Sequence, residues 1–249
     1  MGRKKKESSQ PVPELVIDKN PITLHPLKCR NQKQKFFREQ IRKHDITICD
    51  GIAGSGKTFI ALYEGVYKML CHTYDKVVLC KSVISTPDQE IGFIPGTVEE
   101  KMNPHIMSYK GNLMKMLDNN EDHVKRLFND KKVEVLPLAY IRGVTLDNSY
   151  IIIDEAQNIS MELFKSIITR IGENSKMIFL GDIEQVDFDS DKKRKQSALQ
   201  HIIEIFKNSD DIATVHFEDD ECVRNPIIPK ILNRLRDFEK THNKKKGGD

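Results

Sequence analysis

The chain has 249 residues, which is enough for one or two domains and for a sizeable hydrophobic core. Hydrophobic residues make up 38% of it and charged residues 31%, and no apolar run approaches the roughly 18 residues of a transmembrane helix. We therefore expect a globular protein without membrane association. The net charge is only +3, and basic residues at the two ends account for it, which leaves solubilising tails and nucleic-acid-binding arms as alternatives.

The cysteines and the N-terminus predict a cytoplasmic protein. The five cysteines are odd in number and never two residues apart, and no two histidines have the spacing of zinc ligands. Neither a disulfide framework nor a zinc site is therefore predicted. The N-terminus has basic residues but no apolar stretch after them, and Lys6 stands where N-myristoylation needs Ser or Thr.

Strands alternate with helices along the chain, between two ends that lack such a pattern. Residues 1–25 are predicted to be an irregular basic arm, and residues 239–249 a disordered basic tail. Short apolar runs predict strands at 45–49, 76–80, 133–139, 150–154, 176–182 and 212–217. Apolar residues at helical spacing predict helices at 32–43, 57–70, 161–171, 196–207 and 226–238. This alternation predicts one three-layer α/β domain over residues 26–238, with a mainly parallel sheet.

The segment from residue 82 to 132 interrupts the alternation after the second strand. A turn is predicted at Pro95, and a capping box from Thr97 to Glu100 is predicted to start a helix. Asn103 and Pro104 look like the N-cap and first residue of a helix. We expect a helical insertion over the carboxyl ends of the strands, where open α/β sheets bind ligands. Its use as a lid or partner contact and a purely structural use are both open.

A glycine-rich motif links the strand at 45–49 to the helix that follows it. It fits the pattern G-x-x-x-x-G-K-[ST] and consists of Gly51, Ile52, Ala53, Gly54, Ser55, Gly56, Lys57 and Thr58. Its glycines let backbone N–H groups wrap around a phosphate, and the helix N-terminus adds partial positive charge. Lys57 is predicted to reach the β- and γ-phosphates of a nucleotide, and the Thr58 hydroxyl to bind Mg²⁺. The alternative, a chance glycine-rich turn, does not account for the strand and the helix on either side.

Two polar clusters follow later strands. Asp154 is predicted to hold Mg²⁺, and Glu155 to activate the attacking water as general base. The glutamate favours hydrolysis over kinase chemistry, because a nucleotide kinase transfers phosphate to a bound acceptor and needs no base for water. Gln185 is suited to contact the γ-phosphate or the attacking water. The alternatives are an acidic pair that caps a buried strand, and an ordinary polar loop.

The order strand, DEAQ, helix, strand, GDIEQ is similar to that in the first RecA-like domain of superfamily 1 helicases. Together with the glycine-rich motif at Gly51–Thr58, which we call the P-loop, four blocks resemble the PhoH-like family of P-loop ATPases. The resemblance is strongest to the short members of this family that bacteriophages often carry. These blocks are IGFIPGTVEEKMNP (91–104), VEVLPLAYIRGVTLDNSYIIIDEAQN (133–158), ITRIGENSKMIFLGDIEQVD (168–187) and ECVRNPIIPKIL (221–232). The resemblance covers residues 28–235, nearly everything but the tails.

The resemblance implies binding and Mg²⁺-dependent hydrolysis of ATP on a RecA-like core, and a role in RNA metabolism. It also implies that Gln32 reads the adenine edge and so favours ATP over GTP; the alternative is a surface residue of a helix. The sequence departs from the family at Ser82, where Pro is usual, and at Asn225, where His is usual. No PIN-type nuclease or KH-like RNA-binding domain is recognised, so no nuclease activity or sequence-specific RNA grip is expected. A phage-encoded member would act in the host cytoplasm.

One P-loop predicts one RecA-like domain, whereas a superfamily 1 motor closes two such domains over ATP. We expect the other half of the site to come from a neighbouring copy. Arg142, Arg170 and Arg224 are the candidates to act in trans, Arg224 with a catalytic role, and each could equally form a surface salt bridge. An arginine supplied in this way is worth about 10³–10⁵ in rate. Such head-to-tail contacts produce a ring or a filament, with a hexamer as the family-like expectation.

The segment from Lys28 to Lys43 carries seven cations against one glutamate and is predicted, with the tails, to face RNA or single-stranded DNA. Two functions stay open. The first is an oligomeric ATPase motor on RNA or single-stranded DNA. The second is a nucleotide-gated adaptor that recruits a partner such as a ribonuclease and hydrolyses ATP slowly. Stimulation of turnover by nucleic acid distinguishes them.

Overall fold

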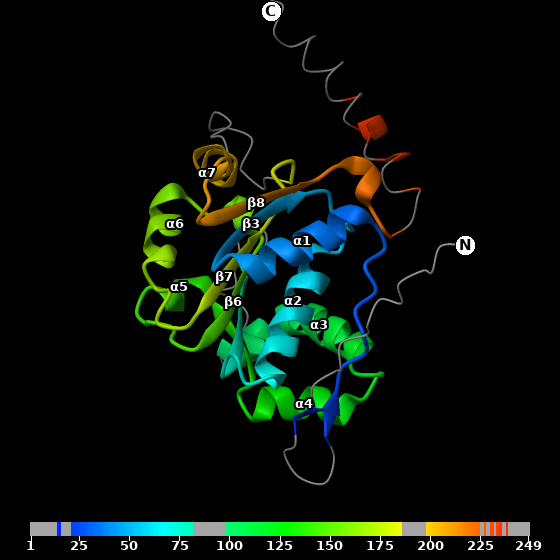
Figure 1. Ribbon diagram of the computed structural model, residues 1–249, viewed down its shortest axis with the longest axis vertical. Helices are drawn as coiled ribbons and strands as arrows, with labels where there is room; N and C mark the ends of the chain where they lie inside the picture. Colours follow the sequence, from blue (N-terminus) through cyan, green and yellow to red (C-terminus); the bar gives the residue numbers. More distant parts are fainter. Residues whose placement is uncertain are drawn as a thin grey trace, which may run out of the picture.

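Parallel strands form a six-stranded central sheet in the part of the chain that the computed structural model describes (Figure 1). The described residues are 14–15, 21–81, 98–185 and 198–224, together with 227, 230, 231, 233–235 and 238. The strands are β3 (Ile46–Gly51), β4 (Lys76–Lys81), β5 (Val133–Pro137), β6 (Ser149–Asp154), β7 (Lys176–Leu180) and β8 (Ile212–Phe217). Their order across the sheet is β5-β4-β6-β7-β3-β8, and each neighbouring pair is parallel. The predicted α/β class with a mainly parallel sheet is confirmed.

Helices cover both faces of this sheet (Figure 1). One face is covered by α1 (Gln32–Lys43), α2 (Lys57–Leu70), α3 (Val98–Met116) and α4 (Glu121–Asn129). The other is covered by α5 (Leu138–Ile141), α6 (Met161–Ile168) and α7 (Ala198–Phe206). Each face of the sheet has its own hydrophobic core, and successive residues of a strand point into opposite cores. In β4, Val77 and Leu79 belong to the core on the α2 side, whereas Val78 and Cys80 belong to the core on the α5 side. Strands that are buried on both faces appear as continuous apolar runs, which made them visible in the sequence.

The sheet brings the predicted motifs to one end of the domain. β3 ends at Gly51 and β6 ends at Asp154, and β7 lies between these two strands. Gly181 and Asp182 follow β7 directly. Because the six strands of this sheet are parallel, their carboxyl ends share one end of the sheet, where α/β proteins bind ligands.

Most element boundaries lie within about two residues of the prediction, and two of the differences have clear local reasons. α1 and α2 have the predicted bounds. The run predicted as a strand over 133–139 stops at Pro137, which has no N–H to continue the ladder, and α5 follows. α6 ends at Ile168, because Ile171 already forms a bridge with Leu146. The described residues between 227 and 238 are helical, as predicted.

Part of the segment predicted to be an irregular arm belongs to the folded domain. β1 (Glu14–Leu15) pairs antiparallel with β2 (Ile22–Thr23). Ile22 and Leu24 are each 1% exposed and lie in the same core as α1 and α2. Two apolar residues between prolines give no periodic signal, so the prediction placed the domain boundary too late.

The insertion is helical, as predicted, and its first helix begins directly after Thr97, where the predicted capping box starts a helix. α3 starts at Val98 and continues through Asn103 and Pro104, so the prediction that these two residues begin a helix is wrong. Proline inside a helix removes one backbone hydrogen bond. Tyr109 and Leu113, farther along α3, are fully buried in the core, and this packing favours an uninterrupted helix.

Some predicted features lie outside the described residues. These are the basic tail at 239–249, the turn and capping box within 82–97, and the departures from the family pattern at Ser82 and Asn225. Among the described residues, no helix combines the length and the apolar character that crossing a membrane requires.

Candidate active site

The loop between β3 and α2 turns at glycines with unusual backbone angles. Gly51, Gly54 and Gly56 have φ angles of 129°, 88° and 89°, which side chains rarely tolerate. At Gly51 a Cβ would also lie 2.3 Å from the carbonyl oxygen of Phe217 in β8. Gly56 is the N-cap of α2 and makes no side-chain cap, so no side chain competes with a phosphate for the first N–H groups of the helix.

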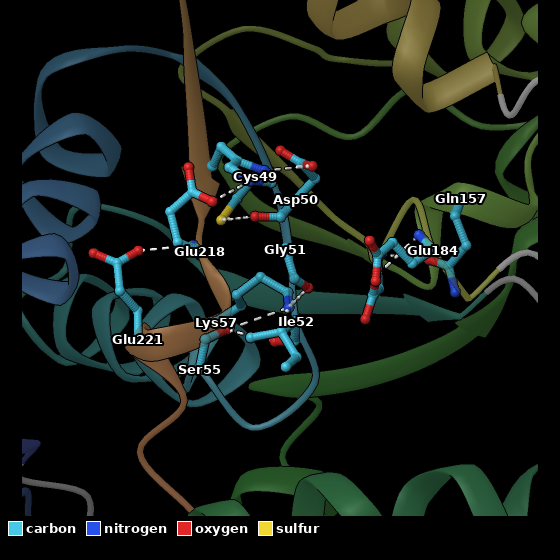
Figure 2. A network of polar contacts seen from close by, with 12 residues as sticks. Cys49, Asp50, Gly51, Ile52, Ser55, Lys57, Gln157, Glu184, Glu218 and Glu221 are labelled. Atoms are coloured by element: carbon cyan, nitrogen blue, oxygen red, sulfur yellow. Dashed lines mark hydrogen bonds and ion pairs between the residues drawn. The ribbon is translucent and has the colours of Figure 1, made fainter. Parts of the chain in front are cut away.

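Lys57 folds back over this loop (Figure 2). Its ammonium group donates to the carbonyl oxygens of Gly51 at 2.5 Å and Ile52 at 2.9 Å, and to the hydroxyl of Ser55 at 3.3 Å. The Ser55 hydroxyl in turn donates to the Ile52 carbonyl at 2.9 Å. A phosphate would offer the ammonium group a charged acceptor in place of these neutral oxygens.

The two acidic residues at the end of β6 have different backbone conformations. Asp154 completes the strand, whereas Glu155 has φ 57° and ψ 40°, a left-handed conformation that is uncommon for glutamate. The Asp154 carboxylate accepts hydrogen bonds from the Tyr109 hydroxyl and from the Glu155 N–H, both at 3.1 Å. Burial and the neighbouring charge of Glu155 raise the pKa of Asp154, against the attraction of Lys81. A divalent cation would favour the charged form of this carboxylate.

The sequence prediction missed two residues that contact this pair. Lys81 ends β4 in register with Asp154, and its Nζ lies 3.4 Å from a carboxylate oxygen of Glu155. A cation at the end of a neighbouring strand is a signal that could have been used. Tyr109 comes from α3, and its approach to Asp154 depends on how the insertion packs, which the sequence does not reveal. The insertion thus supplies a residue to the site.

One pocket of about 1140 Å³ joins the motifs. The predicted residues that line it are Ala53, Gly54, Gly56, Lys57, Thr58, Asp154, Glu155, Gln185 and Arg224. Gln185 is exposed, and its N–H donates to the carbonyl of Asp182, which also lines the pocket. Gly51, Ile52 and Ser55 are buried behind the loop surface. Motifs that are far apart in the sequence therefore form one site.

Gln34, and not Gln32, is the glutamine that α1 contributes to this pocket. Gln32 is exposed at the start of α1 and does not line the pocket, so its predicted contact with adenine is not supported. Gln34 is 4% exposed, and its Nε2 donates to the Ser55 carbonyl at 2.7 Å. Its Oε1 accepts from the Arg30 N–H, also at 2.7 Å. Gln34 thereby ties α1 to the phosphate-binding loop.

A segment after β8 also lies against the loop. The Val223 N–H donates to the Gly54 carbonyl at 3.1 Å, and the Arg30 guanidinium donates to the Val223 carbonyl at 2.8 Å. The stem of Arg224 is so close that a Cβ on Gly54 would lie 3.0 Å from its Cδ. Arg224 therefore borders the pocket of its own chain.

Arg142 and Arg170 do not line this pocket. Arg142 is exposed at the C-cap of α5. Arg170 follows α6, and its guanidinium donates to the Ser166 carbonyl at 3.4 Å and the Thr169 hydroxyl at 3.3 Å. Any action of either arginine on a nucleotide would have to be on that of another copy.

The segment from Lys28 to Lys43, which we call the basic segment, has several of its cations paired with carboxylates of the same domain. Arg38 and Arg42 donate through Nε to Glu64 of α2 at 2.5 and 2.7 Å, and Glu64 is 1% exposed. Lys43 pairs with Glu39 at 2.8 Å. The charge added up over residues 28–43 treated Arg38 and Arg42 as free to bind nucleic acid, because their partner Glu64 in α2 is distant in sequence. The charge that could meet a nucleic acid is therefore smaller than predicted.

The residues of the pocket fit ATP with Mg²⁺. In the described part of the chain, no group of three His, Cys, Asp or Glu could hold a metal ion by itself. Mg²⁺ in phosphate-binding sites usually takes one or two protein oxygens and completes its shell with phosphates and water. The Thr58 hydroxyl and the Asp154 carboxylate, both in the pocket, are oxygen donors of this kind.

Comparisons with known proteins place the chain in a family. A profile of the family described as PhoH-like protein matches residues 26–236. The chain is 33% identical over 215 residues to a PhoH-like protein of Synechocystis sp., covering 86% of this chain and 64% of that protein. It is 32% identical over 206 residues to a PhoH-like protein of Bacillus subtilis, covering 83% and 63%. It thus spans less than two thirds of the length of these relatives. Among solved structures, the large terminase of a thermophilic bacteriophage in complex with ADP aligns with 82% of this chain and 49% of its own, at 16% identity and a TM-score of 0.48.

Proposed function

This chain belongs to the PhoH-like protein family, and we propose that it binds ATP with Mg²⁺ and hydrolyses the ATP. The observation that carries the proposal is the convergence of the phosphate-binding loop, the pair Asp154 and Glu155, and Gln185 on one pocket. A nucleotide kinase also has such a loop, but the carboxylate of Glu155 favours water as the acceptor of the phosphoryl group.

Each group has its own task in the proposed reaction. The N–H groups of the loop and the ammonium group of Lys57 bind the β- and γ-phosphates. Thr58 and Asp154 would hold Mg²⁺, which neutralises phosphate charge when it is bound. Glu155 accepts a proton from the attacking water as the water oxygen bonds to the γ-phosphorus and the bond to the ADP oxygen breaks. Gln185 orients that water.

Two variants separate nucleotide binding from hydrolysis. Lys57→Ala removes a phosphate contact, so ATP with Mg²⁺ should no longer raise the melting temperature, whereas the wild type gains about 2.7 kcal/mol at 100 times the Kd. Glu155→Gln preserves shape and hydrogen bonding but removes the base, so ATP should still stabilise the protein while turnover is lost. A full ATP-induced shift in Lys57→Ala, or wild-type hydrolysis by Glu155→Gln, would contradict the proposal.

We further propose that the ATPase acts in the cytoplasm on RNA or single-stranded DNA, as a helicase-like motor. Lys28 and Arg30, two cations of the basic segment, line the same pocket as the P-loop, which supports coupling between nucleotide and nucleic acid. Binding should weaken steeply with salt, because phosphate contacts release counterions. Turnover should rise when RNA or single-stranded DNA is added at low salt. Unchanged turnover with both nucleic acids would argue against the motor.

We propose that copies of the chain assemble into a ring or a filament, with a hexamer expected. Arg142 and Arg170 do not line the pocket of their own chain, so a role in hydrolysis requires a neighbour's ATP. Turnover per subunit should then rise with protein concentration, alongside the mass measured by light scattering. A monomer with constant specific activity would contradict the assembly.

Mixed variants test which arginine acts between subunits. Because Arg224 lies against Gly54 of its own chain, a mixture of Arg224→Ala with Glu155→Gln should recover no activity. A mixture of Glu155→Gln with Arg142→Ala or Arg170→Ala should recover part of it for the arginine that acts in trans, since some interfaces then combine an intact base with an intact arginine. Recovery in the Arg224→Ala mixture would assign Arg224 to the neighbour's site.

The second candidate is a nucleotide-gated adaptor that recruits a partner such as a ribonuclease, with slow hydrolysis. The observation in its favour is the hydrogen bond from the Val223 N–H to the Gly54 carbonyl, which links the P-loop to the C-terminal part of the chain. An adaptor should bind its partner differently with ATP and with ADP, at a turnover that nucleic acid does not change. Nucleic-acid-stimulated hydrolysis would favour the motor instead.

A further inference from the structure

A buried glutamine bridges two strand ends at the active site. Gln157 lies in a short 3-10 helix (η2, Ala156–Asn158) directly after the acidic pair and is 1% exposed. Its Nε2 donates to a carboxylate oxygen of Glu155 at 2.9 Å. Its Oε1 accepts from the backbone N–H of Asp182, which follows β7, at 3.1 Å. Gln157 is labelled in Figure 2, apart from the group of residues around Lys57.

The far end of this bridge leads to the residue predicted to contact the γ-phosphate. The carbonyl of Asp182 accepts from the N–H of Gln185 at 3.0 Å. Asp182 is therefore bonded to Gln157 through its N–H and to Gln185 through its carbonyl. Gly181 leaves room for the side-chain amide of Gln157, because a Cβ at position 181 would lie 2.9 Å from Oε1 of Gln157. A side chain at position 181 would therefore push the amide away from its partner.

The other carboxylate oxygen of Glu155 is also engaged. Lys81 Nζ lies 3.4 Å from Oε1 of Glu155, while the Gln157 amide binds Oε2. The two contacts fix the orientation of a side chain whose backbone is in the uncommon left-handed region. Unlike Lys81, the amide of Gln157 is neutral, so it orients the carboxylate without adding a charge beside it.

We propose that Gln157 is the positioning residue of the ATPase site, which holds the carboxylate of Glu155 in place and ties it to the loop that carries Gln185. This inference rests on the proposed role of Glu155 as base. A misplacement of about 1 Å at a reacting group can cost on the order of 100-fold in rate. Loss of the bridge should therefore lower kcat and leave ATP binding largely unchanged, because Gln157 is absent from the pocket lining.

Two substitutions of similar size remove different parts of the bridge. Gln157→Met keeps the volume and removes both hydrogen bonds. Gln157→Glu keeps an acceptor for the Asp182 N–H but loses the donor and places a second negative charge beside Glu155. Thr47→Val is the control, because Thr47 is a buried polar residue of β3 whose hydroxyl has no hydrogen-bond partner among the described residues.

The experiment measures kcat, KM and the ATP-induced melting shift of these variants, and combines Gln157→Met with Glu155→Gln. Both Gln157 variants should lose about 10- to 100-fold in kcat, with KM and the melting shift within about 3-fold of wild type, and Thr47→Val should match the wild type. In single-turnover measurements, Gln157→Met should change nothing further in the Glu155→Gln background, because a residue that acts through Glu155 has no effect without it.

The outcomes separate this inference from the proposed function. Wild-type kcat in both Gln157 variants, with only a lower melting temperature, would reduce Gln157 to a structural tie. An equal loss in the presence and absence of the Glu155 carboxylate would show that Gln157 does not act through it. Both results leave the ATPase proposal intact. Wild-type hydrolysis by Glu155→Gln would instead overturn the role of the base, and this inference with it.

Discussion

Replacement of Gln34 by methionine should cost stability and ATP affinity, whereas the same change at Gln32 should cost neither. The Gln34 side chain is 4% exposed and makes one hydrogen bond to the Ser55 carbonyl and one to the Arg30 N–H. Gln32, two positions earlier on α1, is exposed. Methionine is close in size to glutamine and helix-compatible, so the pair of variants isolates the hydrogen bonds.

The magnitude follows from the surroundings of the two partners. Ser55 is fully buried, so its carbonyl is left without a partner in Gln34→Met, at a cost of about 1–3 kcal/mol. Arg30 is exposed and its N–H can bond to water, so the loss there is only about 1 kcal/mol. The free energy of unfolding should therefore fall by about 2–4 kcal/mol, whereas Gln32→Met should stay within about 0.5 kcal/mol of wild type.

Urea denaturation without ATP measures the first effect, and ATP titration followed by fluorescence measures the second. We expect the Kd for ATP to rise about 10-fold in Gln34→Met, equivalent to about 1.4 kcal/mol, because Ser55 is part of the phosphate-binding loop. An unchanged Kd and stability in Gln34→Met would refute the reasoning. A weakened Kd in Gln32→Met alone would restore the assignment that the family resemblance implied.

Two further predictions concern groups at the ends of β6 and β3. Tyr109→Phe removes a hydrogen bond to Asp154, and the Mg²⁺ concentration for half-maximal hydrolysis should rise about 10-fold, as for other groups that orient metal ligands; an unchanged requirement would contradict this. Burial alone would lower the pKa of His216, but the attraction and hydrogen bond of Asp50 at 2.8 Å outweigh it and raise that pKa above its ordinary value of 6.5. The stabilising effect of the pair is fully present below pH 6.5 and is lost as the pH rises through the higher pKa of the folded state. Stability should thus fall over this range in the wild type and vary less in His216→Gln, and equal slopes in urea denaturation would argue against the pair.

The motifs could be predicted from the sequence because their chemistry is local. Lys57 and Thr58 follow the glycines directly, and Asp154 ends an apolar strand, so neither assignment depends on distant contacts. The topology then had to bring them together, and a parallel sheet does so at its carboxyl end whatever the order of the strands. The position of β7 between β3 and β6, the two strands that carry the motifs, could not be derived from the spacing of the motifs alone.

The sequence did not reveal which face of a helix a residue lies on, or which charged residues pair across the fold. Successive residues of a helix are rotated by about 100°, so Gln32 and Gln34 differ by about 200° and point to nearly opposite sides. A motif that identifies a glutamine but not its face can therefore miss by two positions. Arg38 and Arg42 appeared as free charge for the same reason, because their partner Glu64 is contributed by another helix.

The P-loop is bonded to segments from both ends of the domain, and this arrangement gives a bound nucleotide a route to the rest of the molecule. The carbonyl of Ser55 accepts from Gln34 of α1, and the carbonyl of Gly54 accepts from Val223 after β8. A phosphate that draws Lys57 away from its present acceptors acts on the same few residues of backbone, so movement of the loop must be transmitted to one of these bonds or break it. The residues after Val223 lead to the helical stretch that ends the described chain. An adaptor that changes its partner needs such a connection, and a motor that changes its hold on nucleic acid can use it as well, so the response of turnover to nucleic acid is the test that separates the two functions.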